Sequence, residues 1–528
     1  MTASRPAATR AVVWIALLVF VMIGTLYVLN ALEAEYPWIN HDVGYHSYLG
    51  KEMARGERLY VDLKEDNPPG SPLLLGALYA VADTLGLPDF AGQHLFVLIL
   101  GAAGLWVLRF ALEEGSDDVA RALVLLAYVL VVVRGGFSNS IVLEDPGAPY
   151  DFGQREHLFS ILFLPYLFMR LRRDRAPWWF LPFAALLGWV ATFKPFWPPM
   201  LVLVEAFVWW RRRVLHPRVP AALFAGASLV FVALALHSRD SLARFLTDNI
   251  PMYFRGGYDF YEKSYTVFLG TGLHHAMVAG FAVLLLAAVL AARLDTGARP
   301  VVGLFLALAV FAYFAVWHQG KFWSYHTMPF FALTLVPAMH FAGVALGRWK
   351  QGTARRVLAA GLAAVLLVGA GATVAGTARM LTRYPPLGSF LCPIVEPYER
   401  VMYFSMSVMV QYPPLRLRQE MVGPWTVFLD LPELMALPDP AERDRRIAAF
   451  VEELRATIDN ERPELLVFSP QGQALPAGAT LHDVLADLGA LPLAEYRPVS
   501  ARAYGVEGRW IEGWKLYQRV DARPGPGR

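Results

Sequence analysis

The sequence predicts a polytopic α-helical membrane protein that ends in a small soluble α/β domain. The chain has 528 residues, of which 56% are hydrophobic and 17% are charged, and its mean hydropathy is +0.40. Soluble domains are less hydrophobic and carry about 25% charged residues. Long apolar runs fill the first part of the chain and then stop. We therefore divide the chain into a membrane domain, 1–378, and a soluble domain, 379–528.

Eleven apolar runs approach or reach the length of about 17 to 25 residues that a membrane-spanning helix needs. The first run follows Arg5 and Arg10, as in a signal peptide, but its length of about 22 residues favours a retained helix. The runs are 11–32, 90–110, 119–133, 157–171, 178–193, 198–210, 219–237, 266–292, 300–317, 327–347 and 357–378.

A further apolar segment, 72–87, decides the topology. If it does not cross, the arginine-rich loops all fall on one side, which the positive-inside rule makes cytoplasmic. We therefore expect 72–87 to be an interfacial helix. These loops hold Arg5/Arg10, Arg109/Arg121, Arg170/Arg172/Arg173/Arg175, Arg211/Arg212/Arg213/Arg218, Arg293/Arg299 and Arg348/Lys350/Arg355/Arg356. The outer side then receives 33–89, 134–156, 194–197, 238–265, 318–326 and the tail.

The tail has the pattern of a small α/β domain. We expect amphipathic helices over 441–460 and 480–490 and strands over 464–468 and 514–520. It carries no metal or nucleotide motif, so we interpret it as a structural or acceptor-positioning module. The net charge of +3 is too small to indicate nucleic-acid binding. The single cysteine, Cys392, cannot form an intrachain disulfide.

A polar run after the first helix carries the most informative motif. Residues 38–75 combine an early acid and tyrosine, a helix with small residues, GERLYVD (56–62) and a Pro-Pro pair. This order resembles the first periplasmic loop of GT-C glycosyltransferases, which include the protein O-mannosyltransferases and the lipid A aminoarabinose transferases. The chain has His41-Asp42 where two adjacent acids often stand, which leaves the sugar and the acceptor open.

The resemblance implies that Asp42 is the general base of the reaction. An acceptor hydroxyl or amine must lose a proton as it attacks the anomeric carbon, and a carboxylate can take it. The alternatives are a solvated loop acid and a helix N-cap. We expect His41 and Tyr45 to contact substrate, and we interpret His41 and His46 as hydrogen-bonding groups rather than metal ligands.

The second outer loop, 135–159, contains GQREHLF immediately before an apolar run. Ionisable groups at such a position are costly unless they are paired or used. The resemblance implies a phosphate contact for Arg155 and a catalytic or pairing role for Glu156. An interfacial anchor made of Arg155, Glu156 and His157 is the alternative. The cofactor stays undetermined; a divalent metal, Mg²⁺ or Mn²⁺, is the candidate, with Asp145 and Asp151 as its ligands.

Two lysines lie in aromatic, proline-rich frames at the outer edge, TFKPFWPP (192–199) and HQGKFWSYHTMP (318–329). A cation there would offset the charge that develops on a leaving lipid phosphate. We therefore expect Lys194, Lys321 and His326 to bind the donor. Interface anchoring beside Trp197 and Trp323 is the alternative for the lysines.

Together these features predict an inverting membrane glycosyltransferase. The donor would be a polyprenyl-phosphate sugar, and the acceptor an envelope glycan, lipid or protein at the outer face of a bacterial inner membrane. No glycine-rich nucleotide loop appears. The rival functions are a flippase or transporter for lipid-linked glycans, which would show midplane charges or inverted repeats, an O-antigen-ligase-like enzyme and an assembly scaffold.

Overall fold

The computed structural model describes most of the chain, and the following statements concern that part. The described residues are 7–63, 65, 67–113, 118–134, 151–173, 175–214, 216–251, 265–320, 324–349, 352–383, 389–404, 412–417, 420–421, 434–435, 437, 439–470, 480–507 and 511–522.

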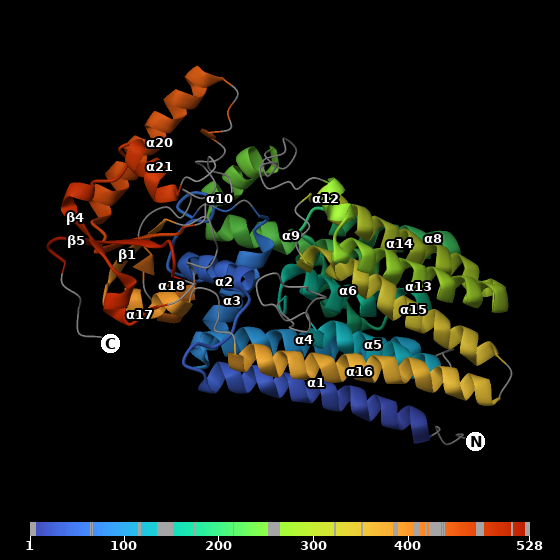
Figure 1. The fold of residues 1–528 in the computed structure, drawn as a ribbon. Helices are drawn as coiled ribbons and strands as arrows, with labels where there is room; N and C mark the ends of the chain where they lie inside the picture. Colours follow the sequence, from blue (N-terminus) through green and yellow to red (C-terminus); the bar gives the residue numbers. More distant parts are fainter. Residues whose placement is uncertain are drawn as a thin grey trace.

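Eleven helices within the described ranges coincide with the eleven predicted apolar runs, and they lie side by side as a bundle (Figure 1). They are α1 (Ala7–Glu33), α4 (Asp89–Leu112), α5 (Asp118–Arg134), α6 (Arg155–Arg172), α7 (Leu181–Ala191), α8 (Trp197–Arg212), α9 (Arg218–His237), α13 (Gly272–Leu294), α14 (Arg299–His318), α15 (Met328–Arg348) and α16 (Thr353–Arg383).

Seven candidate spans in the described part are long and apolar enough to cross a membrane, so the chain is a multi-pass membrane protein. They correspond to α1, α4, α9, α13, α14, α15 and α16. α7, with 11 residues, and α8, with 16, are shorter than a simple span. The count of eleven spans therefore stays a prediction. α16 also continues to Arg383, beyond the predicted end of its apolar run at 378.

Two helices between the bundle and the C-terminal sheet form the base of the candidate site. α2 (His41–Ala54) begins at Asn40, whose side chain accepts hydrogen bonds from the backbone of Asp42 and Val43. α3 (Gly70–Thr84) covers most of the predicted 72–87 helix. The two helices cross closely because Gly50 and Gly76 meet: a Cβ on Gly50 would lie 2.4 Å from the Cα of Gly76. Backbone packing therefore fixes α2 on α3.

The smaller elements connect this frame. They are α10 (Arg239–Arg244), a π-helical turn at Phe245–Asn249, α12 (Tyr265–Leu269), α17 (Cys392–Val395), α18 (Tyr412–Leu417), and 3₁₀ turns at Trp178–Phe180, Thr296–Ala298, Ser324–Thr327, Ser389–Leu391, Leu493–Glu495 and Ala501–Tyr504.

The C-terminal part contains a five-stranded sheet in the order β2-β1-β3-β5-β4. β1 lies parallel to β2 and β3, whereas β5 is antiparallel to β3 and β4. The predicted helices and strands are present as α20, α21, β3 and β5. The bounds are β1 (Arg400–Phe404), β2 (Glu420–Met421), α20 (Pro440–Glu461), β3 (Leu465–Phe468), α21 (Leu481–Asp487), β4 (Tyr496–Val499) and β5 (Lys515–Arg519).

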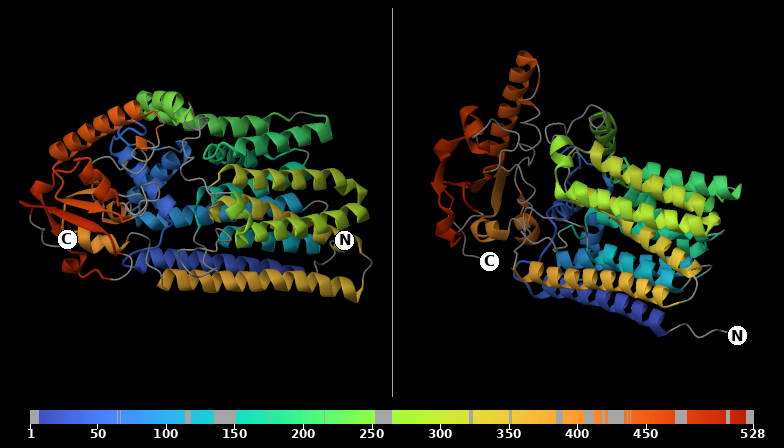
Figure 2. Two further views of the ribbon diagram at one scale, coloured as in Figure 1. Left: turned by 45° about the horizontal axis from the view of Figure 1, so that its top comes forward. Right: turned by 45° about the vertical axis from the view of Figure 1, so that its right-hand side comes forward.

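The sheet lies at the end of the bundle that carries α2 and α3, away from the N-terminus, in all three views (Figures 1 and 2). Alternate residues of β1 and β3 enter two apolar clusters, as the two-residue period of a strand requires. Contact with the bundle runs through Cys392 and Tyr412, which belong to one buried cluster with Ile39 and Leu75. The Tyr412 hydroxyl also donates to the Pro37 carbonyl at 2.9 Å.

Candidate active site

Asp42 lies in the first turn of α2, so the N-cap is Asn40 and the N-cap alternative for Asp42 is wrong. The Gln154 amide reaches this turn from the start of α6. Its Nε2 donates to Asp42 Oδ2 at 2.9 Å and to Asn40 Oδ1 at 2.8 Å. His41 Nε2 lies 3.2 Å from Asp42 Oδ1. Each oxygen of the mostly buried Asp42 carboxylate therefore has a nitrogen neighbour.

The electrostatic surroundings keep Asp42 ionised. Burial alone would raise the pKa of the carboxyl, but the charges of His41 and Arg155 outweigh burial and lower the pKa to about 2. The opposite holds for His46, one turn further along α2. Burial, reinforced by the charge of Arg155, lowers the pKa of His46 well below its usual value, so His46 is a neutral imidazole at neutral pH.

The sequence prediction placed Arg155 and Glu156 in the loop before the helix. In the structure they are the first two residues of α6. The helix starts earlier than its apolar run because polar residues form its buried first turn. Arg155 is 6% exposed and Glu156 is 2% exposed. Arg155 donates from Nη1 to the Asn67 side chain. His157 Nδ1 accepts from the Gly153 backbone, so this residue supports the helix start, as in the anchor interpretation.

Lys194 joins the same cluster from the turn between α7 and α8. Its Nζ lies 3.4 Å from Glu156 Oε1 and donates to Gln319 Oε1 at 3.3 Å. Burial, reinforced by the charge of Arg155, lowers the pKa of Lys194 to about 8. The lysine is therefore an internal cation beside Glu156, which does not fit an interface anchor that reaches for solvent.

The segment between α2 and α3 contributes an acid that the sequence prediction missed. Glu65 is 3% exposed and accepts from the backbone and side chain of Asn67. Burial raises the pKa of Glu65, although hydrogen bonds from Tyr45 and Asn67 oppose the shift. Tyr45, a predicted substrate contact, is thus a neighbour of Glu65. Glu65 directly precedes Asp66-Asn67-Pro68 within the motif region 38–75. This position could have identified it as a candidate site residue.

A tyrosine from the region before α15 completes the cluster. Tyr325 is buried and lies within electrostatic reach of Asp42, Arg155 and Glu156. The ring of the neighbouring His326 packs edge-on against Tyr325, with centroids 4.5 Å apart. His326 is buried beside the cluster, and its role as a donor contact stays a prediction. Lys321 lies outside the described residues.

The predicted metal ligands are Asp145 and Asp151. Asp145 lies outside the described residues, and Asp151 is buried at 1% exposure near Tyr325. Among the residues that the structure places, no three His, Cys, Asp or Glu side chains are grouped to hold a metal ion. The acids Asp42, Glu65 and Glu156 instead lie near Arg155 or Lys194. These positive charges oppose the binding of a metal cation at the acids.

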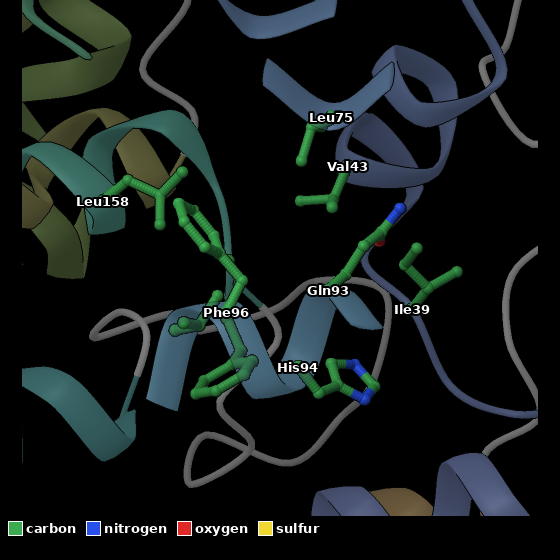
Figure 3. Close-up of a pocket in the computed structure, with 10 residues that line it drawn as sticks. Ile39, Val43, Leu75, Gln93, His94, Phe96 and Leu158 are labelled. Carbon is green, nitrogen blue, oxygen red and sulfur yellow. The ribbon is translucent and has the colours of Figure 1, made fainter. Parts of the chain in front are cut away.

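A small cavity lies beside the first turn of α2, which carries Asp42 (Figure 3). Its wall contains Val43, which follows Asp42, and Gly153, which precedes Gln154. The Gln93 amide extends toward α2 and donates to Ser47 Oγ. The other lining residues are Ile39, Leu75, His94, Phe96, Val97, Phe152 and Leu158. The lining is mainly apolar and includes none of the charged residues of the cluster. The cavity is therefore separate from the group of charges around Asp42.

The arrangement combines the ionised Asp42 carboxylate with two cations, the buried Arg155 and the partly buried Lys194. Asp42 can accept a proton, while Arg155 and Lys194 can bind an anion that arrives between α2, α6 and the α7–α8 turn. This combination suits a reaction in which a nucleophile loses a proton and an anionic group leaves.

Comparison with known proteins identifies the fold. No family model matches the chain, and no curated protein sequence matches it. Crystal structures of ArnT from Cupriavidus metallidurans are similar over 97% of this chain and 99% of that chain, with a TM-score of 0.51. One shows the apo state, at 15% sequence identity, and the other shows ArnT bound to undecaprenyl phosphate, at 16%.

A third structure is the arabinofuranosyltransferase AftD from Mycobacteria, with a TM-score of 0.47 and 17% identity over 96% of this chain and 40% of that chain. At these identities the likeness to ArnT shows a common fold. The overall fold expected from the resemblance is thereby confirmed.

Proposed function

We propose that this chain, a membrane protein with the GT-C fold of ArnT, is an inverting glycosyltransferase that uses a polyprenyl-phosphate sugar as donor. One observation carries the proposal: the ionised Asp42 shares a buried cluster with Arg155 and Lys194. The likeness to ArnT bound to undecaprenyl phosphate supports a lipid-phosphate donor. The acceptor would be an envelope glycan, lipid or protein.

The reaction is a single displacement at the anomeric carbon. The acceptor oxygen or nitrogen forms the new bond, and Asp42 takes its proton. The bond between the anomeric carbon and the phosphate oxygen breaks, and the electron pair leaves with the polyprenyl phosphate. Arg155 and Lys194 stabilise the negative charge that grows on this phosphate.

The remaining predicted contacts take supporting roles. His41 holds one oxygen of Asp42, and Tyr45 holds Glu65, so both position acids beside the substrate. Glu156 pairs with Lys194 and places its ammonium toward the phosphate. We assign Lys321 and His326 to the donor side as well, because they lie within four positions of Tyr325 in the sequence.

The pH dependence should reveal the Lys194 cation. Its ammonium is present below about pH 8 and is lost as the pH rises through that value, because the pKa is lowered. We expect kcat/KM, which reports the free enzyme, to fall above that pH in the wild type. Lys194→Arg should shift the fall to higher pH. Superimposable profiles of the two proteins would show that the Lys194 charge does not act on the reaction.

The side of the membrane on which the site lies follows from the arginine-rich loops. A reporter fused after Arg173 or Arg212 should be cytoplasmic, and one fused after Gly388 should be periplasmic. Cysteine labelling of the same positions provides the control. A cytoplasmic reporter at Gly388 would contradict the outward-facing site and the choice of a lipid-linked donor.

The function itself is tested by the lipids and glycans of a deletion strain. Mass spectrometry should show one sugar missing from an envelope glycan, lipid or protein, together with accumulation of the corresponding polyprenyl-phosphate sugar. The accumulated lipid would identify the donor. Unchanged donor levels and intact envelope glycans would refute the proposal.

A further inference from the structure

The end of the bundle opposite the candidate active site carries a second group of charges. α6 begins at the site and ends with Arg170 and Arg172, and α8 ends beside it with Arg211 and Arg212. Near these arginines, α8 also carries the acid Glu205.

Both carboxylate oxygens of Glu205 accept hydrogen bonds from residues of α6. Arg170 Nε and Nη2 donate to its two carboxylate oxygens at 2.6 Å each, and the Tyr166 hydroxyl donates to Oε1 at 2.6 Å. Such a bidentate pair is the strong form of a carboxylate–guanidinium contact. Glu205 therefore neutralises the charge of Arg170 but not the charges of Arg172, Arg211 and Arg212.

Arg172 is held in place without being neutralised. It is partly buried, and its Nη2 lies 3.1 Å from Nε2 of the buried His340. A guanidinium can only donate, so His340 accepts here and must be neutral, with its proton on Nδ1. The guanidinium of Arg211 lies close enough for its charge to oppose that of Arg172.

Neither arginine forms an ion pair with a carboxylate within the described part of the chain. Asp174 lies outside that part. Two like charges within electrostatic reach of one another, of which Arg172 is partly buried and Arg211 exposed, repel unless an anion offsets them. The arrangement therefore provides a site for an anion with several acceptor oxygens, such as a phosphate.

The neighbouring side chains indicate where this phosphate comes from. Trp209 and Trp210, which precede Arg211 on α8, are 54% and 51% exposed. Exposed tryptophans of membrane helices lie at the level of the lipid headgroups. We therefore expect Arg211, and Arg172 near it, at the depth of the lipid phosphates.

We propose that Arg172 and Arg211 bind the phosphate of an anionic phospholipid in the leaflet at this end of the bundle. The planar guanidinium donors match phosphate oxygens, and the second positive charge favours a headgroup with net negative charge over a zwitterionic one. This site is independent of the proposed transferase reaction.

The test is native mass spectrometry of the purified full chain with phosphatidylglycerol and phosphatidylcholine of matched acyl chains. The double variant Arg172→Gln/Arg211→Gln removes both charges and keeps a polar, uncharged side chain at each position. We expect it to retain phosphatidylglycerol at least about tenfold less than the wild type. The control, Arg213→Gln/Arg218→Gln, loses two exposed arginines at the same end and should retain the lipid.

Arg172→Lys/Arg211→Lys keeps the charge and should bind, which separates loss of the site from misfolding. Equal loss in the double variant and its control would overturn the proposal, as would equal retention of phosphatidylcholine by the wild type. Displacement of the lipid by millimolar inorganic phosphate would identify a soluble phosphate as the occupant and overturn the lipid assignment.

Discussion

Asp42→Asn should lower the rate of sugar transfer by at least about a hundredfold, the usual contribution of a positioned general base. Asparagine keeps the size of the side chain and can still accept from Gln154, but it cannot take the proton of the acceptor. Donor binding should persist because Arg155 and Lys194 are unchanged. The measurement is single-turnover transfer by purified protein from a defined polyprenyl-phosphate sugar, with donor affinity measured separately.

Two further variants sharpen this result. Asp42→Glu should recover little activity, because the longer side chain displaces the carboxylate by about one methylene. Asp62→Asn is the matched control, since Asp62 lies in the same connecting region but pairs with Arg58 at 2.8 Å at the surface. It should transfer at close to the wild-type rate. If Asp42→Asn also does so, Asp42 is not the base.

Arg155→Gln should produce the second large loss, about a hundredfold or more in kcat, as is typical when one stabilising donor is removed from a developing anion. The charge of Arg155 is buried among the acids Asp42, Glu65 and Glu156, so its removal also weakens the binding of an anionic donor. Arg155→Lys should lose less, since it retains the charge but not the planar fork. Rates and donor affinities should be measured at fixed ionic strength.

The control for this series is Arg58→Gln, which removes an arginine of the same connecting region from a partly exposed ion pair with Asp62. A partly exposed pair of this kind contributes little to stability, so the variant should fold and transfer normally. Thermal unfolding of Arg155→Gln must show a folded protein for the comparison to hold. A folded Arg155→Gln with wild-type kinetics would exclude Arg155 from the phosphate site.

The helices could be predicted from the sequence because each contains a continuous apolar run. The helix ends could not, since polar first turns obscure them: α6 starts at Arg155, before its apolar run. Strands β1, β2 and β4 were also missed: β2 has only two residues, β4 contains Pro498, and the short apolar run of β1 does not distinguish a strand from a helix.

The candidate site was only partly predictable for a different reason. Asp42, Arg155 and Lys194 have residue types and local motifs that indicate chemistry, and the structure brings them together. Gln154 lies 112 positions from Asp42 in the chain, and Tyr325 comes from a still later segment. Such partners are set by packing between distant helices, which a single sequence does not reveal.

The most direct test of the central claim is the stereochemistry of a single turnover. Purified protein in nanodiscs should be given the polyprenyl-phosphate sugar that accumulates in the deletion strain, together with an acceptor fraction from the same cells. The account predicts release of one polyprenyl phosphate for each sugar transferred, and NMR of the product should show an inverted anomeric centre. A retained anomeric configuration, or transfer without release of polyprenyl phosphate, would contradict a single displacement assisted by Asp42.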